Sequence, residues 1–360
     1  MKLIDRNLII LSAGVAVTLF STGVACAIGP ADQLVTDPVA IPNPALYGVV
    51  TVDNPGPSGT GTVVGVEQDP LGGGNYKDIV DVITADHVVA GANNGTILFG
   101  ATGTAATFNW AYWQNYWTSG GQREDIALIQ ATAINVPNAT WTNIVNSVAS
   151  VANPALGLEP GGNPFLFSTS QSFTEVGYGL LGTYNPAIAA LAGNPAGYQI
   201  GALNTFGTRR FQNNMQTGAI TAPAAHGIYF EPLVPFNILS PSNAGGGAGM
   251  PGDSGGPLFT GPYGGSPVPS GINRGDGNIP INYTNNLSAV YVGLGTSQTG
   301  TDGNRYRLVG TNQNAVPIDA GVYDWLSTWI NNPSTVPEPG SIALLAFGGI
   351  PLLLRRKRKA

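Results

Sequence analysis

The sequence predicts an all-β fold that ends in a short helix. Short apolar runs recur along the chain, and Gly, Pro and Asn separate them. Sustained helical periodicity is scarce before the closing segment. There, Val322, Trp325, Leu326 and Trp329 fall at helical spacing and predict one apolar face over residues 321–330.

The predicted strands fall into two groups along the chain. In the first group, apolar or alternating runs predict strands at residues 47–52, 61–66, 79–85, 96–99 and 126–130. In the second group, similar runs predict strands at residues 165–167, 173–180, 227–230, 257–260 and 289–293. A Gly-rich segment within residues 240–251 predicts a flexible approach to the polar turn that follows it.

That polar turn, Gly-Asp-Ser-Gly-Gly-Pro at residues 252–257, presents Ser254 between glycines. A serine hydroxyl is a weak nucleophile at neutral pH and needs an imidazole to take its proton. Flanking glycines remove Cβ atoms, so that a substrate carbonyl can approach backbone N–H donors. In a chain with 51 glycines the same string could be an ordinary turn. The catalytic interpretation therefore depends on partners.

Candidate partners lie upstream. The chain has two histidines, and one of them, His87, follows an apolar run that ends in Thr-Ala-Asp-His. Asp125 immediately precedes the apolar run at residues 126–129. A buried carboxylate beside a histidine fixes its tautomer and stabilises the imidazolium formed during proton transfer. Alternation along a strand points the neighbouring acids Asp86 and Glu124 away from this pair. Taken singly, His87 could be a core histidine and Asp125 a cap at the start of a strand.

The three motifs, in the order His, Asp, Ser, resemble those of the trypsin/chymotrypsin-like serine proteases. The resemblance implies that Ser254 is the nucleophile, His87 the general base and then acid, and Asp125 the residue that orients His87. The backbone N–H groups of Gly252 and Ser254 would form the oxyanion hole. Asp253 would be a structural acid that pairs with the α-amine of the processed N-terminus.

The resemblance extends to the fold and spans roughly residues 45–332. Residues 175–179 resemble the strand that opens the second barrel of the family, and residues 321–330 resemble its closing segment and helix. The resemblance therefore implies two six-stranded antiparallel β-barrels (chymotrypsin-like) followed by a short C-terminal helix. The first barrel would lie at about 45–150 and the second at about 163–332, within a protease domain at residues 28–332.

The substrate pocket is also inferred by resemblance. Alignment to Ser254 places Ala248 at the base of the primary specificity pocket, and Gly293, Leu294 and Gly295 along its wall. An acid at the base would select Lys or Arg, which alanine cannot do. We therefore expect cleavage after an apolar residue. Gly293 also stands where many relatives have a serine that hydrogen-bonds the catalytic aspartate.

Residues 1–27 have the pattern of a secretory signal peptide. Lys2 and Arg6 give a positive start, residues 8–20 are largely apolar, and Ala-Cys-Ala at residues 25–27 supplies small residues for cleavage. The apolar run is short for a transmembrane anchor of about 20 residues. Cleavage after Ala27 would remove Cys26, the one cysteine of the chain. A lipid-modified Cys26 is the alternative, but the preceding residues lack the usual leucine.

Without Cys26 the mature protein forms no intramolecular disulfide. About 300 residues bury enough apolar surface to fold without one, so the loss bears on the rigidity of loops around the site. Cleavage after Ala27 would expose Ile28, which resembles the small apolar N-terminus that family members insert beside the acid before the serine. Removal of a further pro-segment within residues 28–46 stays open.

Residues 333–360 closely resemble a PEP-CTERM sorting tail of Gram-negative bacteria that make extracellular polysaccharide. Pro-Glu-Pro at residues 337–339 is followed by a mostly apolar stretch at residues 341–354 and a basic cluster at residues 355–359. An apolar segment followed by basic residues stalls with its positive end in the cytoplasm. The resemblance implies processing by a membrane exosortase and transient membrane contact, with an ordinary tail anchor as the alternative.

Charge and composition exclude several function classes. Residues 28–337 carry seven basic against 18 acidic side chains, a net charge of −11. No cluster of Lys and Arg resembles a nucleic-acid site. The sequence shows no metal-ligand cluster, and no Gly-Lys-Ser or Gly-Lys-Thr follows the Gly-rich run. We therefore expect no cofactor and no metal.

Two functions remain at this stage. The favoured one is an exported serine endopeptidase that acts through an acyl-enzyme on protein or peptide substrates. Signal peptidase and exosortase would be its partners during export, and the cell surface or extracellular matrix of a Gram-negative bacterium its location. The alternative is a non-catalytic surface or matrix binding protein on a protease-like scaffold. The natural substrate, subsite specificity and oligomeric state do not follow from the sequence.

Overall fold

The structure is a computed structural model. It describes residues 47–55, 58–117, 121–151, 172–179, 182–184, 198–200, 207–216, 224–226, 228–237, 252–260, 286–294, 298–299, 305–306 and 313–330. The predicted strand at residues 165–167 and both chain ends therefore lie outside the described residues.

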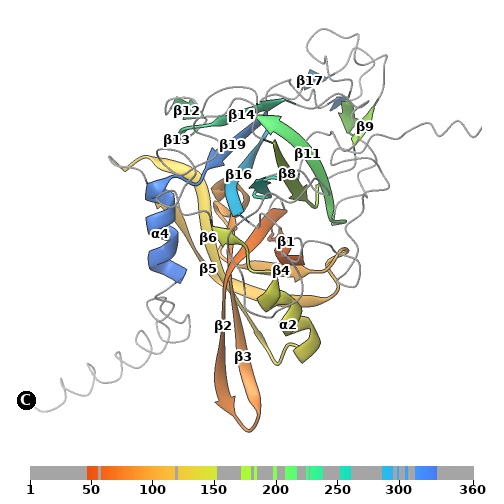
Figure 1. Ribbon diagram of the computed structural model, residues 1–360, viewed down its shortest axis with the longest axis vertical. Coiled ribbons are helices and arrows are strands. Elements are labelled where there is room, and N and C mark those ends of the chain that lie inside the picture. Colours follow the sequence, from red (N-terminus) through yellow and green to blue (C-terminus); the bar gives the residue numbers. More distant parts are fainter. Residues whose placement is uncertain are drawn as a thin grey trace, which may run out of the picture.

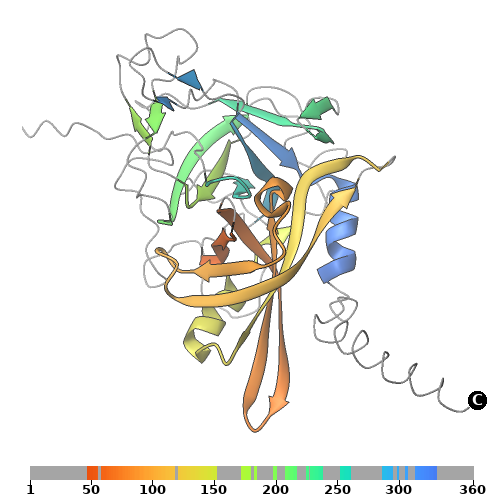
Figure 2. The same cartoon turned by 180° about the vertical axis from the view of Figure 1, so that it is seen from behind.

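The first half of the described chain forms a closed antiparallel barrel with strand order β1-β2-β3-β6-β5-β4. Its strands are β1 (Val49–Asp53), β2 (Gly59–Gly72), β3 (Asn75–Thr84), β4 (Gly95–Phe99), β5 (Ala106–Trp117) and β6 (Arg123–Ile134). The β2–β3 hairpin projects beyond the barrel, away from the second sheet (Figures 1 and 2). The five strands predicted in this half are confirmed, and β5 was missed.

The second half forms a seven-stranded sheet with the order β15-β8-β11-β14-β19-β16-β7, and β15 also pairs with β16. Its strands are β7 (Ser150–Val151), β8 (Ser172–Gly177), β11 (Arg210–Gln216), β14 (Val234–Asn237), β15 (Pro257–Thr260), β16 (Asn286–Leu294) and β19 (Gln313–Pro317). All its pairings are antiparallel except that of β7 with β16. One closed six-stranded barrel is therefore present, and a second closed six-stranded barrel stays a prediction.

Three short hairpins lie outside these sheets. They are β9 (Gly182–Tyr184) with β10 (Tyr198–Ile200), β12 (Ala224–His226) with β13 (Tyr229–Glu231), and β17 (Gln298–Thr299) with β18 (Arg305–Tyr306). The strand predicted at residues 227–230 is therefore partly wrong, because Ile228 is in a turn before β13.

Strands of the second sheet bury both faces. Along β16, Ala289 and Tyr291 lie in one apolar cluster within the second sheet, whereas Val290 and Val292 join the large core shared with the first barrel. Leu258 and Phe259 of β15 divide between the two clusters in the same way. Successive strand residues point to opposite faces, so this alternation packs the second sheet against the barrel.

Tyr178 joins the two halves of the molecule by hydrogen bonds. Its N–H donates to Thr60 Oγ1 at 3.0 Å, and its buried hydroxyl lies 3.0 Å from Val49 O and 2.8 Å from Gly100 O. Because β8 ends just before Tyr178, these bonds fix the edge of the second sheet on the barrel.

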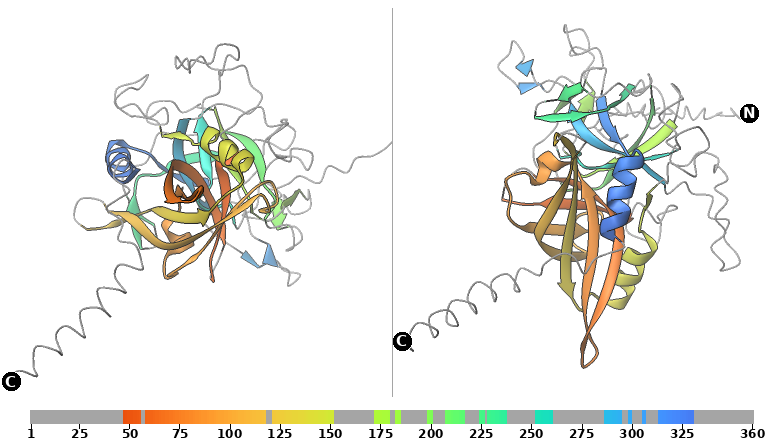
Figure 3. Two further views of the ribbon diagram at one scale, coloured as in Figure 1. Left: turned by 90° about the horizontal axis from the view of Figure 1, so that it is seen from below. Right: turned by 90° about the vertical axis from the view of Figure 1, so that its left-hand side faces the viewer.

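The predicted C-terminal helix is confirmed as α4 (Ala320–Ile330). Asp319 caps its first turn, since its Oδ1 accepts the Val322 N–H at 2.9 Å. Val322 and Leu326 are buried, and the Trp325 ring lies 5.5 Å from that of Tyr116. The helix therefore packs alongside the barrel, as the right panel of Figure 3 shows. A second helix, α2 (Asn138–Asn146), was not predicted.

Candidate active site

His87 stands on a single helical turn at the end of β3. The apolar strand ends at Thr84, Ala85 keeps extended backbone, and α1 (Asp86–Val89) begins directly afterwards. Val88 and Val89 are buried and anchor the turn in the core. The His87 side chain keeps 35 % exposure, so the imidazole is held at the surface by buried neighbours.

Asp125 holds His87 at two points. Its Oδ2 lies 2.6 Å from His87 Nδ1, and its Oδ1 accepts the His87 backbone N–H at 2.8 Å. The Asp125 side chain is 1 % exposed. An ionised carboxylate only accepts hydrogen bonds, so the neutral imidazole carries its proton on Nδ1. The other ring nitrogen, Nε2, is then an acceptor and can act as a base.

Residues 252–256, which we call the Ser254 loop, are hydrogen-bonded to both the barrel and the second sheet. Thr60 of β2 binds it twice, because its N–H donates to Ser254 O and its hydroxyl to Gly252 O, both at 2.8 Å. From the second sheet, Tyr291 O accepts the Gly255 N–H at 2.7 Å. These contacts hold the loop at the junction of barrel and sheet.

Gly255 brings the loop against the strand that carries His87. Its φ of +88° lies in the left-handed region, and a Cβ there would stand 2.0 Å from Thr60 O and 2.1 Å from Thr84 Oγ1. The same Cβ would lie 2.9 Å from Ala85 N, two residues before His87. Only glycine satisfies this backbone angle and this close approach.

The structure shows direct contacts for two of the three predicted catalytic residues. His87 and Asp125 are directly bonded, whereas Ser254 reaches their neighbourhood through its loop, and its Oγ makes no hydrogen bond to His87 within the described chain. The catalytic roles of all three stay predictions at this point.

The predicted oxyanion donors lie in the same loop. The N–H groups of Gly255 and Gly256 are already used, by Tyr291 O and Asp253 O. In contrast, the N–H groups of Gly252 and Ser254 donate to no backbone carbonyl in the described ranges. Gly252 has a φ of +97°, which glycine adopts without strain.

Asp253 is fully buried and faces Gly179. Its Oδ1 accepts the Gly179 N–H at 2.6 Å, and a Cβ on Gly179 would lie 2.5 Å from its carboxyl carbon. A structural position fits these contacts. Residue 28 lies outside the described chain, so pairing of Asp253 with a processed N-terminus stays a prediction.

The specificity pocket is described only in part. Gly293 and Leu294 end β16, where the register with β19 shifts between Tyr291 and Gly293. Ala248 and Gly295 lie outside the described residues. Their pocket roles therefore stay predictions.

Further charged residues surround the pair, and no sequence motif marks two of them. Arg123 forms an ion pair with the buried Asp86, and its guanidinium lies 5.7 Å from the centre of the Tyr229 ring. Glu231 Oε2 accepts the Asp125 N–H at 2.6 Å. Arg123 and Glu231 were missed, because neither belongs to a motif. Asp86 was expected to point away from the pair by strand alternation; it lies on the helical turn α1 instead, and its carboxylate pairs with Arg123.

Burial shifts the acids beside the pair toward their neutral forms. Desolvation raises the pKa of Asp86, although the Arg123 guanidinium counteracts it. Desolvation, together with the nearby charges of Asp319 and Glu231, raises the pKa of Glu124 to about 8. Glu124 is therefore largely protonated at neutral pH.

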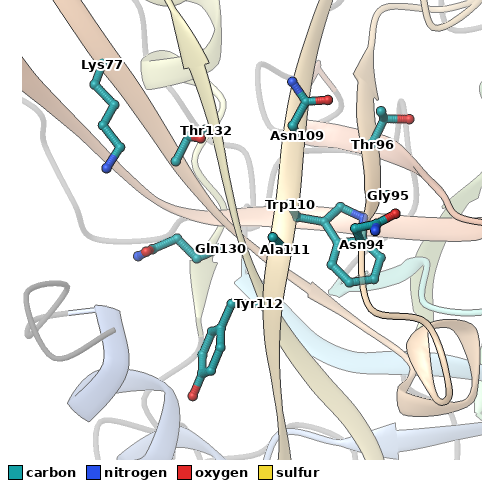
Figure 4. Close-up of a pocket in the computed structure, with 10 residues that line it drawn as sticks. All are labelled: Lys77, Asn94, Gly95, Thr96, Asn109, Trp110, Ala111, Tyr112, Gln130 and Thr132. Carbon is teal, nitrogen blue, oxygen red and sulfur yellow. The ribbon is translucent and has the colours of Figure 1, made fainter. Parts of the chain in front are cut away.

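A pocket of about 480 Å³ lies on the outer face of the barrel (Figure 4). Thr96, Asn109 and Thr132 follow one another across β4, β5 and β6, and β5 is irregular between Trp110 and Tyr112. The pocket is lined by Lys77, Asn94, Gly95, Thr96, Asn109, Trp110, Ala111, Tyr112, Gln130 and Thr132. His87, Asp125 and Ser254 are not among these residues.

The described residues offer neither a metal site nor a membrane-spanning helix. They contain no group of three or more His, Cys, Asp or Glu side chains that could hold a metal ion. No helix among them is long and apolar enough to span a membrane.

Comparisons with known proteins give a weak fold likeness. No protein-family model and no curated protein matches the chain. A Glu endopeptidase in complex with MPD is 11% identical, with a TM-score of 0.43 over 81% of this chain and 95% of its own. The MamO protease domain from Magnetospirillum magneticum is 14% identical, with a TM-score of 0.38 over 80% and 98%. The HtrA-type protease AlgW with a tripeptide is 12% identical, with a TM-score of 0.38 over 81% and 64%.

By their names, these solved structures are an endopeptidase and two proteases, all at low identity to this chain. Their TM-scores are too low to support an argument about this chain. The function must therefore be argued from its own residues.

Ionisation of the buried Glu124 should lower the free energy of unfolding as the pH rises from 4.5 to 8. Its pKa is about 8 in the folded protein and 4.5 as a free group, so between these values the folded state binds more protons than the unfolded state. The free energy of unfolding then decreases from pH 4.5 to pH 8. We expect Glu124→Gln to raise it at pH 8 by on the order of 1–3 kcal/mol, with little change at pH 4.5, in urea denaturation.

The matched control is Asp324→Asn, which changes an exposed acid of α4. An unchanged pH slope in Glu124→Gln would contradict the assignment.

Proposed function

We propose that this protein is a serine endopeptidase in which Ser254, His87 and Asp125 form the catalytic triad. The observation that carries the proposal is the two-point contact of Asp125 with His87, beside a loop that glycines and Thr60 hold against the same strand. Such contacts give an imidazole a fixed tautomer and a fixed direction. A core histidine needs neither an exposed ring nor a neighbouring nucleophile loop.

The reaction proceeds in two halves. Ser254 Oγ attacks the scissile carbonyl carbon while His87 Nε2 takes its proton, and Asp125 stabilises the imidazolium. The N–H groups of Gly252 and Ser254 bind the oxyanion of the tetrahedral intermediate. The C–N bond then breaks, and His87 protonates the leaving amine. In the second half a water attacks the acyl-enzyme carbonyl while His87 takes its proton; the ester C–O bond then breaks, His87 returns the proton to Ser254 Oγ, and the carboxylic acid product leaves.

A non-catalytic binding protein on the same scaffold is the second candidate. The pocket on the outer barrel face supports it, because its volume falls within the range of ligand sites. The two candidates differ in one respect that can be measured, the reactivity of Ser254.

The reactivity of Ser254 can be measured with a chemical probe. A fluorophosphonate probe should label the folded, processed protein, because a base-activated serine attacks its phosphorus. Ser254→Ala should abolish labelling and lower kcat/KM on a peptide substrate by about 10⁴-fold or more. Ser327→Ala, a substitution on α4, is the matched control and should label like the wild type. Unlabelled but folded wild-type protein would favour the binding protein.

The specificity of the proposed endopeptidase depends on Ala248 and its predicted neighbours. A pocket without an acid at its base should accept an apolar side chain before the cleaved bond. Hydrolysis of a peptide library, read by mass spectrometry, should show this preference. Exclusive cleavage after Lys or Arg would exclude it.

The patterns at residues 1–27 and 333–360 bear on export. We propose that residues 1–27 are removed by signal peptidase and that an exosortase processes the tail at residues 333–360, which leaves the protein at the cell surface or in the matrix. The apolar and basic pattern of both ends supports this. Mass spectrometry of the mature protein should then find an N-terminus at or beyond Ile28 and no residues 341–360. Intact ends on a secreted protein would contradict it.

A further inference from the structure

The backbone of Asp125 is held by a residue from outside the barrel. Glu231, on the β12–β13 hairpin, lies 106 positions further along the chain, and its Oε2 accepts the Asp125 N–H at 2.6 Å. Both side chains are buried, with exposures of 0% and 1%. A short hydrogen bond between groups shielded from water restrains the peptide group at residue 125.

The β-ladder does not supply this constraint. The pairing of β6 with β3 ends at Ala127, opposite Thr84. Its pairing with β5 shifts register between Ala127 and Arg123, so Asp125 lies in the irregular stretch. An N–H in this position needs another acceptor when it is buried, and Glu231 provides one.

The same hairpin strand also meets the other acid beside His87. Tyr229 and Glu231 are two residues apart on β13, so their side chains share a face. The Tyr229 ring lies under Arg123, which is paired with Asp86, and the phenol interacts with Asp86 itself. One short strand therefore contacts both the residue that precedes His87 and the residue that binds its ring.

The carboxyl group of Glu231 can accept the Asp125 N–H whether or not it carries a proton, because a carboxylate oxygen and the carbonyl oxygen of a carboxylic acid are both acceptors. A second buried acid, Glu124, lies close to it, and burial, followed by the charges of Asp319 and Glu231, raises the pKa of Glu124 to about 8. The positioning contact therefore rests on the geometry of the Glu231 oxygen and the Asp125 N–H.

We propose that Glu231 is a positioning residue that holds Asp125, and through it His87, in the orientation needed for proton transfer. This inference rests on the proposed function, because it assigns Glu231 a part in the same site. Asp125 uses both carboxylate oxygens on His87, so a rotation of its backbone moves the imidazole. Glu231 prevents that rotation.

Kinetics of two variants test the role. Glu231→Ala removes the acceptor, so kcat should fall about 10- to 100-fold with KM within about 3-fold. Glu231→Gln keeps an acceptor oxygen and should retain most of kcat. Wild-type kcat in Glu231→Ala would overturn the proposal.

Asp78→Ala is the matched control for a merely structural loss. Asp78 is equally buried, and its Oδ2 accepts the Val136 N–H at 2.7 Å within the barrel, where no site residue contacts it. It should lose stability while its kcat per folded molecule stays that of the wild type. If Asp78→Ala and Glu231→Ala lose kcat equally, Glu231 has no positioning role.

A measurement without turnover separates this inference from the proposed function. In Ser254→Ala protein, the proton on His87 Nδ1 should give a far-downfield ¹H NMR signal, with His226→Gln used to confirm its assignment. Adding Glu231→Gln should preserve the signal, and adding Glu231→Ala should shift or remove it. An unchanged signal in Glu231→Ala would overturn the positioning role even in an active enzyme. A changed signal in a protein whose Ser254 is unreactive would retain the structural role and reject the protease.

Discussion

The buried carboxylate of Asp125 is the constraint on which the site depends. A carboxylate at 1% exposure is costly unless donors surround it, and His87 supplies two, from its ring and from its backbone. Both donors are available only because α1 begins directly after β3 and turns the His87 N–H toward β6. The relative placement of the end of β3, the turn α1 and strand β6 is therefore fixed by one buried carboxyl group, which needs both hydrogen bonds from His87.

Loops around the site keep their shape without disulfides. The mature sequence is predicted to contain no cysteine, and the structure holds the Ser254 loop by other means. Thr60 binds it with its N–H and its hydroxyl, and Tyr291 binds it from the second sheet. Gly255 then allows backbone contact that a side chain would block. Several backbone hydrogen bonds with close packing constrain a loop as a cross-link does, although each of them contributes only about 1 kcal/mol.

The sequence predicted the parts of this molecule that local patterns determine. The apolar strands around His87 and Asp125 were found because alternation and turn residues mark them. Strand β5 was missed because Asn, Gln and Tyr interrupt its apolar residues, and β11 because Arg210–Gln216 is mostly polar. Glu231 could not be found, since its partner is 106 positions away and no motif marks it. The hydrogen-bonded pair of His87 and Asp125 was therefore predictable from the sequence, whereas the contact of Glu231 with Asp125 was not.

The buried acids around His87 do not maximise the stability of the folded protein. Glu124, Asp86 and Glu231 are all buried, and a well-packed apolar side chain in place of a buried charged group is often neutral or stabilising. Asp86 forms an ion pair with Arg123, and Glu231 accepts a hydrogen bond from the N–H of Asp125. Glu124 has a raised pKa and keeps its proton at neutral pH. Each arrangement lowers the cost of an acid without removing it from the surroundings of the imidazole. The contribution of these acids to His87 is therefore a chain of fixed hydrogen bonds, in which Glu231 accepts the N–H of Asp125 and Asp125 accepts both the backbone N–H and the ring N–H of His87.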